Sequence, residues 1–389
     1  MDATSAVSLA LRGRRAIAAV FFMNGVLIGS WAPQIPVFLT RLEISEFTLG
    51  LLILVFGAGA VTAMSWCGYL ISRHGSQKVV RWFGWAGTLG LLAVALASNV
   101  PLAALAMFLF GGLIGGMDVA MNANAVIVEK RLGRAIMSSS HGFWSLGGFA
   151  GGGLGGIAIQ NFGHLPHAIA VTAVALGIAA LALRHVSVDD QPQRHPDRKF
   201  SMPTDPLIYI VGMVALFSMI PEGAVLDWGA LYLRQELGAD LATAGFAFAF
   251  FAGAMAIVRF LGDAVRNRFG AVATMRVSSL IAAGGMLVAG LSSSSWVVIA
   301  AFAFCGVGIA NMVPIAFSAA GNQPGVSSGA GMSVVTTMGY SGLLVAPSAI
   351  GFVGEQTGFS AVFIALSGLL VVVFLMAGLV RRADFDATK

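Results

Sequence analysis

Charged side chains are scarce in this chain of 389 residues. Asp, Glu, Lys and Arg together make up 10% of it, whereas 58% of the residues are hydrophobic. A soluble globular protein carries about 25% charged residues, so the composition excludes that class. The apolar runs are longer than the roughly 20 residues that cross a bilayer, and they recur along the whole chain. The sequence therefore predicts an all-α integral membrane protein.

Several chemical motifs are also missing. No stretch matches the phosphate-binding loop G-x-x-x-x-G-K-[ST], so ATP bound in such a loop is not the driving force. The six histidines lie mostly at span ends and do not cluster, so we expect no metal site. The two cysteines, Cys67 and Cys305, fall inside predicted spans and are not expected to pair. We expect no cofactor and no enzymatic activity, and a proton gradient as the energy source.

Twelve apolar segments are long enough to cross a membrane. With the N-terminus in the cytoplasm, nearly all loop lysines and arginines lie on that side, and only Arg41 and Arg234 lie on the other. This distribution explains the net charge of +5 without nucleic acid. We expect a monomer in a bacterial inner membrane, with both termini cytoplasmic and lipid around it. The predicted spans are 15–39, 47–71, 79–98, 101–128, 136–160, 166–185, 206–234, 242–266, 272–292, 296–320, 326–350 and 358–381.

The two halves of the chain repeat the same landmarks. Arg41 and Gly75 recur as Arg234 and Gly270, which lie 193 and 195 residues later (234 − 41 and 270 − 75). The apolar, glycine-containing run FLFGGLIGG also has a counterpart, FAFCGVGIA, at a similar separation. Matching separations close to half the chain length indicate a duplication of six spans.

The longest polar stretch separates these halves. It reads HVSVDDQPQRHPDRKFSMPTD, is rich in proline and charge, and is typical of a solvated linker. We therefore expect an N-terminal six-helix bundle over 1–185, a cytoplasmic linker over 186–205 and a C-terminal six-helix bundle over 206–389.

The loop after the second span carries a recognisable pattern. GYLISRHGSQKVV resembles the signature loop G-x-x-x-x-R-x-G of the major facilitator superfamily, with Gly68, Arg73, Gly75 and Lys78 in register. The resemblance covers the whole chain and implies twelve transmembrane helices in two pseudo-symmetric six-helix bundles. It also implies a gating role for the four matched residues. Ser72 stands where the family usually has an aspartate, to which an interdomain lock is attributed.

Two further runs resemble the fucose-permease-like and YbjJ-like branch of that superfamily. They are DVAMNANA, which starts at Asp118, and MSSSHGFWSLGG, which starts at Met137. In that branch an acid and, four residues later, an asparagine occupy the fourth span, and Asp118 and Asn122 match them here. The resemblance implies that Asp118 takes part in proton-coupled sugar binding.

Besides Asp263 near the end of the eighth span, three carboxylates lie inside predicted spans, where a charged group is costly to keep. Asp118 and Asn122 are four residues apart, so they stack on one helical face. Glu222 follows Pro221, where we expect a kink, and Asp227 lies about 7.5 Å farther along the same helix. We expect Asp118, Glu222 and Asp227 to be proton-coupling groups, and bonding between helices is the structural alternative for each.

Other polar and aromatic side chains inside the spans are candidate ligands for a small solute. A buried amide also bridges helices and an aromatic ring also packs, so each has a structural alternative. The candidates are Asn24, Trp31, Gln34, Asn122, Trp144, Trp228, Asn311 and Tyr340.

Three further residues are candidates for gating. His141 enters the fifth span near its cytoplasmic end, and a histidine bonded to a loop is the alternative. Arg259 and Asp263 lie four residues apart near the cytoplasmic end of the eighth span. We expect these two to form a structural ion pair that braces a gate.

Together these features predict a secondary active transporter that works by alternating access around a midplane cavity lined by spans 1, 4, 7 and 10. Amides and hydroxyls favour proton-coupled symport of a small polar or sugar-like solute. A carboxylate substrate would favour an arginine or lysine in the cavity, and we expect none near the midplane. The alternative is a proton-coupled efflux antiporter for drugs or metabolites, which the 27 phenylalanines and the glycine-rich fifth span would also fit.

Overall fold

The computed structural model describes residues 3–132, 136–188, 205–323 and 328–383, and within these ranges the chain is helical without strands. The side chains of Ser72 and Asp263 lie outside the described residues. The first half contains α1 (Ala3–Trp31), η1 (Ala32–Gln34), α2 (Ile35–Leu42), α3 (Glu46–His74), α4 (Ser76–Gly87), α5 (Gly90–Leu96), α6 (Val100–Leu132), α7 (Met137–Phe162), α8 (His164–Ala182) and η2 (Leu183–His185). The second half contains α9 (Pro206–Gln235), α10 (Leu241–Phe269), α11 (Ala271–Leu291), α12 (Ser295–Ile309), α13 (Met312–Gly321), α14 (Ser328–Thr357), α15 (Phe359–Met376) and η3 (Ala377–Ala383).

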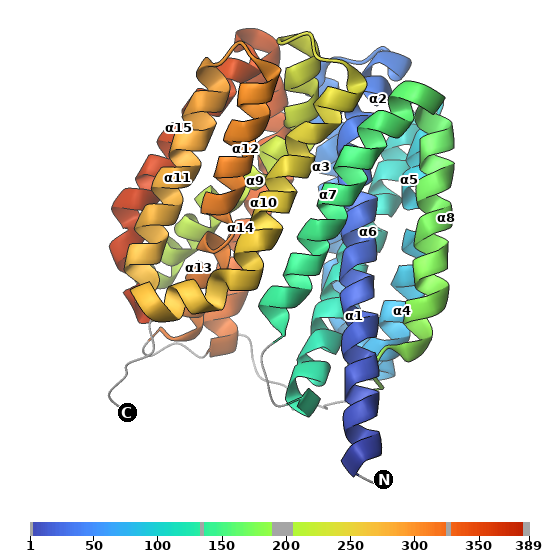
Figure 1. The fold of residues 1–389 in the computed structure, drawn as a ribbon, viewed down its shortest axis with the longest axis vertical. Coiled ribbons are helices and arrows are strands. Elements are labelled where there is room, and N and C mark those ends of the chain that lie inside the picture. Colours follow the sequence, from blue (N-terminus) through green and yellow to red (C-terminus); the bar gives the residue numbers. More distant parts are fainter. Residues whose placement is uncertain (1–2, 133–135, 189–204, 324–327, 384–389) are drawn as a thin grey trace.

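The helices form two groups that stand side by side. In Figure 1, α1 and α4 to α8 lie on the right, and α10 to α15 lie on the left. Helices α7 and α10 run next to each other along the boundary between the groups, and α1 begins at the lower end. We call the upper end the closed end. This arrangement is the predicted one, an all-helical membrane fold of two six-helix bundles.

Backbone geometry repeats between the groups with one fixed separation. Every residue of the described chain with a positive φ has a partner 195 residues away (238 − 43, 270 − 75 and 358 − 163). The pairs are Glu43 with Gly238, Gly75 with Gly270, and Gly163 with Gly358, whose φ angles are 52° and 64°, 79° and 79°, and 88° and 85°. Helix α10 also begins and ends 195 residues after α3 (241 − 46 and 269 − 74). The duplication predicted from the sequence is thus present in the turns.

Most predicted spans are confirmed, with breaks inside three of them. Eleven helices of the described chain are long and apolar enough to cross a membrane. Helix α7 corresponds to the remaining predicted span, and its many glycines add little hydropathy. The first span is interrupted by the 3-10 turn η1, where Pro33 and Pro36 interrupt regular helix geometry. The third is divided at Thr88 and Leu89, and the tenth at Asn311, whereas α9 continues through Pro221.

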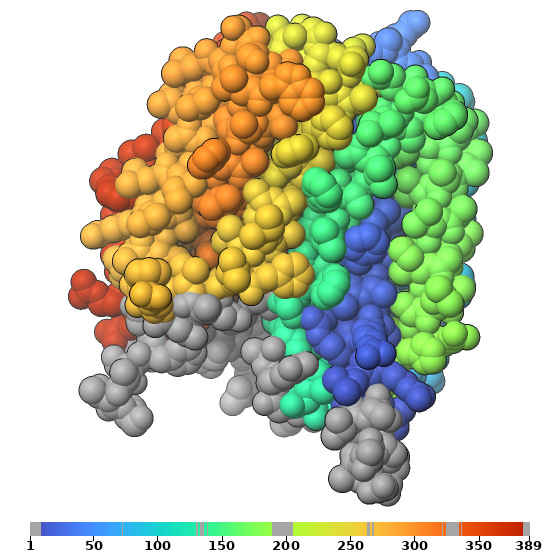
Figure 2. Space-filling view, in the orientation of Figure 1, coloured from blue at the N-terminus to red at the C-terminus, as the bar shows by residue number. Residues whose placement is uncertain are grey.

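Glycines let the two groups touch backbone to backbone along α7 and α10. A Cβ on Gly245 would lie 2.6 Å from the Gly152 carbonyl oxygen and 2.9 Å from Gly156 Cα. Toward the other end the ring of Phe260 fills the space beside Gly142 instead. Figure 2 shows the surfaces of these two helices in contact near the closed end. The halves therefore approach most closely at the closed end.

The equivalent seam between α3 and α14 is packed in the same way. A Cβ on Gly50 would lie 2.9 Å from both the Pro347 carbonyl oxygen and Ser348 Cα. Gly50 and Gly245 are themselves 195 residues apart (245 − 50), so the two seams use equivalent glycines. Close packing of small residues is the usual way in which membrane helices associate.

Candidate functional site

A cavity of about 470 Å³ lies between the two halves. This volume is within the range of about 300–1,000 Å³ that is typical of small-molecule pockets. The four spans expected to line it all contribute residues, from α1, α6, α9 and, for the tenth span, from the break at Ala310 and Asn311 and from α13. Helices α3, α7, α10 and α14 contribute as well, so both halves surround the space.

The three predicted carboxylates, Asp118, Glu222 and Asp227, all line this cavity. They come from two elements, since Asp118 lies on α6 and the other two lie on α9. Asp227 is only 8% exposed. The structure therefore brings the acids of both halves to one space, which the sequence could suggest only from their depth in the spans.

Asp118 is held by side chains of both halves. Asn122, one turn along α6, donates from Nδ2 to the Asp118 backbone oxygen at 2.9 Å and to its carboxylate at 3.3 Å. The hydroxyl of Tyr340 on α14 donates to the other carboxylate oxygen at 3.5 Å. His141 Nε2 lies 3.2 Å from Asn122 Oδ1. A chain of polar contacts thus runs from α14 through Asp118 to α7.

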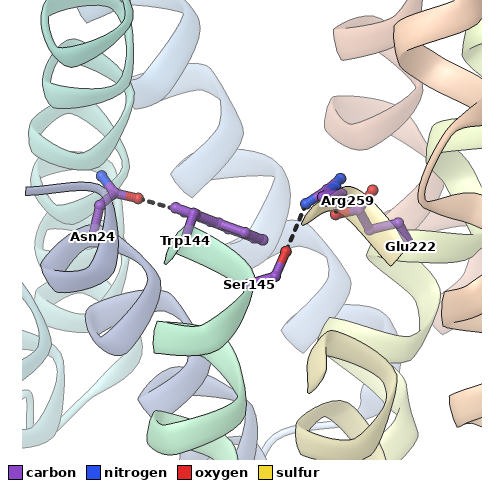
Figure 3. A network of polar contacts seen from close by, with 5 residues as sticks. All are labelled: Asn24, Trp144, Ser145, Glu222 and Arg259. Carbon is purple, nitrogen blue, oxygen red and sulfur yellow. Dashed lines mark hydrogen bonds and ion pairs between the residues drawn. The ribbon is translucent and has the colours of Figure 1, made fainter. Parts of the chain in front are cut away.

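A second set of contacts joins α1 to α7. The indole of Trp144 donates from Nε1 to Asn24 Oδ1 at 2.8 Å, as Figure 3 shows. The amide of Asn24 also donates to the Ile114 carbonyl oxygen at 3.5 Å. Trp31 lines the cavity and packs edge to face against Phe38, with 5.4 Å between the ring centroids. Asn24 and Trp31 therefore have structural partners and also face the cavity, so the two roles proposed for them are compatible.

Arg259 also lines the cavity, which corrects the expectation that no arginine would lie there. Its Nη1 donates to Ser145 Oγ at 2.8 Å, and its Nη2 lies 3.8 Å from Glu222 Oε1 (Figure 3). The ion pair is largely buried, with 13% and 19% of the two side chains exposed. The expectation failed because the position of Arg259 along α10 does not reveal that its side chain is directed toward α9 and α7.

The expected partner of Arg259 was Asp263, whose side chain lies outside the described residues. The pair with Asp263 therefore stays a prediction, and the partners of Arg259 among the described side chains come from α9 and α7. Ser145 was missed in the sequence, although it lies one turn after His141 on the same helix face. Arg266 was not among the candidates predicted from the sequence, yet it too lines the cavity.

Two predicted ligands do not line the cavity. Trp228 is fully buried and stacks on Phe359, with 5.2 Å between the ring centroids. Gln34 donates from Nε2 to the His164 carbonyl oxygen at 2.9 Å, and the same atom lies 2.9 Å from His167 Nδ1. For both, the structure shows the packing and bridging roles that were the alternatives. Asn311 and Tyr340 do line the cavity.

The signature-loop residues lie in the last turns of α3, at the turn after it and in the first turn of α4, and none of them lines the cavity. Gly75 ends α3 with φ 79°, a conformation that favours glycine. Arg73 is exposed and donates to the Tyr69 hydroxyl at 3.0 Å. A Cβ on Gly68 would meet nothing within 4 Å, and Lys78 lies in the first turn of α4. Their gating role stays a prediction.

No group of three or more His, Cys, Asp or Glu residues in the described part of the chain has a geometry suited to a metal ion. The cavity instead offers carboxylates, guanidinium groups, amides and hydroxyls among apolar side chains. Such a surface suits hydrogen bonding to a polar solute and transfer of protons between acids.

Sequence and fold comparisons agree with this architecture. The sequence model of the Major Facilitator Superfamily matches residues 16–228 and 211–388. An uncharacterized MFS-type transporter of Yersinia pestis is 36% identical over 363 residues, which cover 93% of this chain and 94% of that protein.

Two solved structures share the fold. One is a mutant form of the nucleoside transporter NupG, with a TM-score of 0.75 at 13% identity, covering 94% of this chain and 99% of that one. The other is a D-xylose-proton symporter, with a TM-score of 0.73 at 15% identity, covering 95% and 97%.

Proposed function

The chain belongs to the major facilitator superfamily, and from that premise we propose that it moves a small polar or sugar-like solute together with protons by alternating access. Solute and protons enter the cavity between the halves, and the two bundles rock around it. Asp118, Glu222 and Asp227 carry or relay the protons. Asn122 and the amides and aromatic rings on the cavity bind the solute.

The observation that carries this proposal is the contact between Asp118 on α6 and Tyr340 on α14, which joins the two halves across the cavity. A carboxylate accepts a hydrogen bond from a tyrosine hydroxyl, and adding a proton turns the carboxyl group into a donor. Loading Asp118 with a proton therefore changes a contact between the halves. A change of that kind links protonation to conformation, as symport requires.

The charge balance of the cavity supports a neutral solute. Among the described side chains, three carboxylates line it, against the two guanidinium groups of Arg259 and Arg266. The presence of Arg259 removes the objection to a carboxylate substrate. Arg259, however, is already paired with Glu222 and bonded to Ser145. The remaining carboxylates, Asp118 and Asp227, outnumber the remaining guanidinium group, which disfavours an anionic solute. Hydroxyl-rich solutes fit this surface because hydroxyls both donate and accept hydrogen bonds.

Placement in the cell is part of the same proposal. We place the chain in a bacterial inner membrane as a monomer, with bundles over 1–185 and 206–389, a linker over 186–205 and both termini cytoplasmic. The loop lysines and arginines support this orientation. The Asp118 and Asn122 pair supports a place in the fucose-permease-like branch.

Efflux of amphipathic or cationic compounds in exchange for protons is the second candidate. The observation that favours it is the mainly apolar lining, which includes Phe56, Phe248, Phe317 and several methionines beside the three acids. The two functions differ in the sense of proton movement, since a symporter moves solute and protons in the same direction.

The test is proton flux in proteoliposomes that contain a trapped pH dye. Sugars, polyols and cationic drugs are added in turn to wild type and to Asp118→Asn. We expect a hydroxyl-rich solute to drive protons inward with it, and Asp118→Asn to abolish that flux. Flux that only cations drive, in the opposite sense, would establish the antiporter instead. Solute-driven flux that persists unchanged in Asp118→Asn would contradict the assignment of Asp118.

A further inference from the structure

We propose that two side chains at the closed end, Gln160 and Glu355, are latches that hold the halves together and set how often that end opens. Gln160 lies on α7, and its Oε1 accepts a hydrogen bond from the backbone N–H of Ala242 on α10 at 2.9 Å. Glu355 lies on α14, and its Oε2 accepts from the N–H of Phe47 on α3 at 3.0 Å. Each contact runs from one half to the other.

The two latches are equivalent positions of the duplicated fold. Glu355 follows Gln160 by 195 residues, and Ala242 follows Phe47 by the same number (355 − 160 and 242 − 47). This is the separation that relates the positive-φ turns. Both halves therefore use the same position to close the same end.

The amides involved have no acceptor within their own helices. Phe47 and Ala242 are the second residues of α3 and α10, and the first four amides of a helix lack an intrahelical acceptor. The helix caps Ser45 and Asp240 bind other amides, those of Thr48 and Thr243. Phe47 and Ala242 donate to acceptors of the opposite half, and these bonds are lost when the halves part at this end. The Asp240 carboxylate also lies within reach of the Ala242 amide, which gives Glu355 a further reason to be the stronger latch.

The latches lie on the exposed rim of seams that are already well packed. Below the Glu355 latch, Phe47 packs edge to face against Phe352, with 5.9 Å between the ring centroids. Ser348 Oγ donates to the Gly50 carbonyl oxygen at 3.1 Å. Packing thus brings the helices together, and the latches add directional bonds that exist only when the end is closed.

The two latches differ in charge, so they should differ in strength. Glu355 is a carboxylate at the positive end of a helix, whereas Gln160 is a neutral amide. A hydrogen bond to a charged group is roughly twice as strong as a neutral one. The N-terminal end of α3 has one further contact across the halves, in which Gln235 donates to Glu46 at 2.7 Å. We expect Glu355 to be the stronger latch.

Distances between spin labels at the closed end test the proposal without any knowledge of the solute. Ser98 and Ser293 are exposed, lie in the loops before α6 and α12, and are equivalent positions of the two halves (293 − 98 = 195). Spin labels are attached to Ser98→Cys and Ser293→Cys. Double electron–electron resonance then measures the distance between the labels, which increases when the closed end opens. The native Cys67 and Cys305 are buried, and the chain without added cysteines gives the background.

We expect Glu355→Ala to raise the ratio of open to closed molecules about 5- to 10-fold and Gln160→Ala about 2- to 4-fold, with the two factors multiplying in the double variant. Glu355→Gln keeps an acceptor and should open less than Glu355→Ala. Asn161→Ala and Thr357→Ala are the matched controls, because each side chain is exposed and bonds to a carbonyl of its own helix. The controls should match wild type.

The latch proposal is overturned if Glu355→Ala and Gln160→Ala give the same distance distribution as the two controls. All four side chains are exposed, so we expect every variant to fold, and its thermal unfolding midpoint checks this. If Glu355→Ala has a lowered unfolding midpoint, Glu355→Gln and Gln160→Ala are compared with the controls in its place. Distance distributions equal to those of the controls would again overturn the proposal. Because no solute is needed, the outcome is independent of the symport proposal.

Discussion

The two halves of this protein share their backbone but not their cavity chemistry. Turns and helix ends repeat with a separation of 195 residues. At the same separation, Asp118 of the first half corresponds to Val313 in the second (313 − 118), and Arg259 corresponds to Met64 (259 − 64). All four residues line the cavity. The fold is therefore symmetric, whereas the charges on the two sides of the cavity are not.

Features that both halves share determine the fold, whereas charges found in one half alone belong to the candidate site. Glycines at the turns and seams recur in both halves because both must bend and pack in the same way. A charged group in the membrane is costly, so a charge present in one half alone needs a reason outside the fold. Replacing a residue by its counterpart in the other half tests which features belong to which class.

The largest effect should come from the buried ion pair. Arg259→Met installs the counterpart residue and leaves Glu222 without its cation, which we expect to destabilise the fold by about 3 kcal/mol. Adding Glu222→Leu, again the counterpart (222 − 27, Leu27), removes the isolated acid and should restore much of that loss. Thermal unfolding in detergent measures both. If the double variant loses as much stability as the two single variants together, the two residues do not act as a pair.

The seam glycines should give the next largest effect. Gly245→Ala and its counterpart Gly50→Ala each place a Cβ within 3 Å of backbone atoms of the opposite half. We expect each to cost about 2 kcal/mol and to favour opening of the closed end. Gly284→Ala is the control, because a Cβ there meets nothing within 4 Å. Unequal effects at Gly50 and Gly245 would show that the two seams are not equivalent.

A smaller and equal effect is expected at the turn glycines. Gly75 and Gly270 both have φ 79°, and an alanine there costs about 1 to 2 kcal/mol. Gly75→Ala and Gly270→Ala should therefore lower the unfolding midpoint by similar amounts. Gly68→Ala, which has open space around its Cβ, serves as the control. A much larger loss of transport than of stability in Gly75→Ala alone would favour the gating role of the signature loop.

The smallest effect concerns the caps of the equivalent helices α3 and α10. The Thr243 amide that donates to Asp240 at 2.7 Å lowers the pKa of that carboxyl below its usual 3.8. The cap therefore stabilises α10 above about pH 3.8 and is lost as the pH falls through the lowered pKa. The protection factor of the Thr243 amide, which is its intrinsic exchange rate divided by its measured rate at the same pH, should fall at low pH. The Thr48 amide, capped by Ser45, should show no such added change, and Asp240→Ser should remove the difference.

Much of this symmetric frame could be predicted from the sequence. Separations of 193 to 195 residues between arginines and glycines indicated the duplication, because turns need particular residues at particular positions. The stacking of Asp118 and Asn122 followed from their spacing on a helix. All three acids, Asp118, Glu222 and Asp227, were expected inside spans that line a cavity, and the structure finds all three on the cavity.

The chemistry of the site could be predicted less well. Spacing along a span does not fix how a helix is rotated against its neighbours, so Trp228 and Gln34 were assigned to the cavity although both point into packed surroundings. The position of Arg259 along α10 likewise does not reveal the direction of its side chain. Its partners, Glu222 and Ser145, come from other helices and have no signal in local sequence.

The most direct test of the account compares solute exchange with net proton movement in Asp118→Asn. Exchange of labelled for unlabelled solute across a proteoliposome membrane requires the halves to rock but requires no net proton transfer. Using the solute found in the flux screen, we predict that Asp118→Asn keeps exchange and loses solute-driven proton flux. Loss of both activities in a folded variant would make Asp118 part of binding or rocking. Retention of both would contradict its role as the coupling acid.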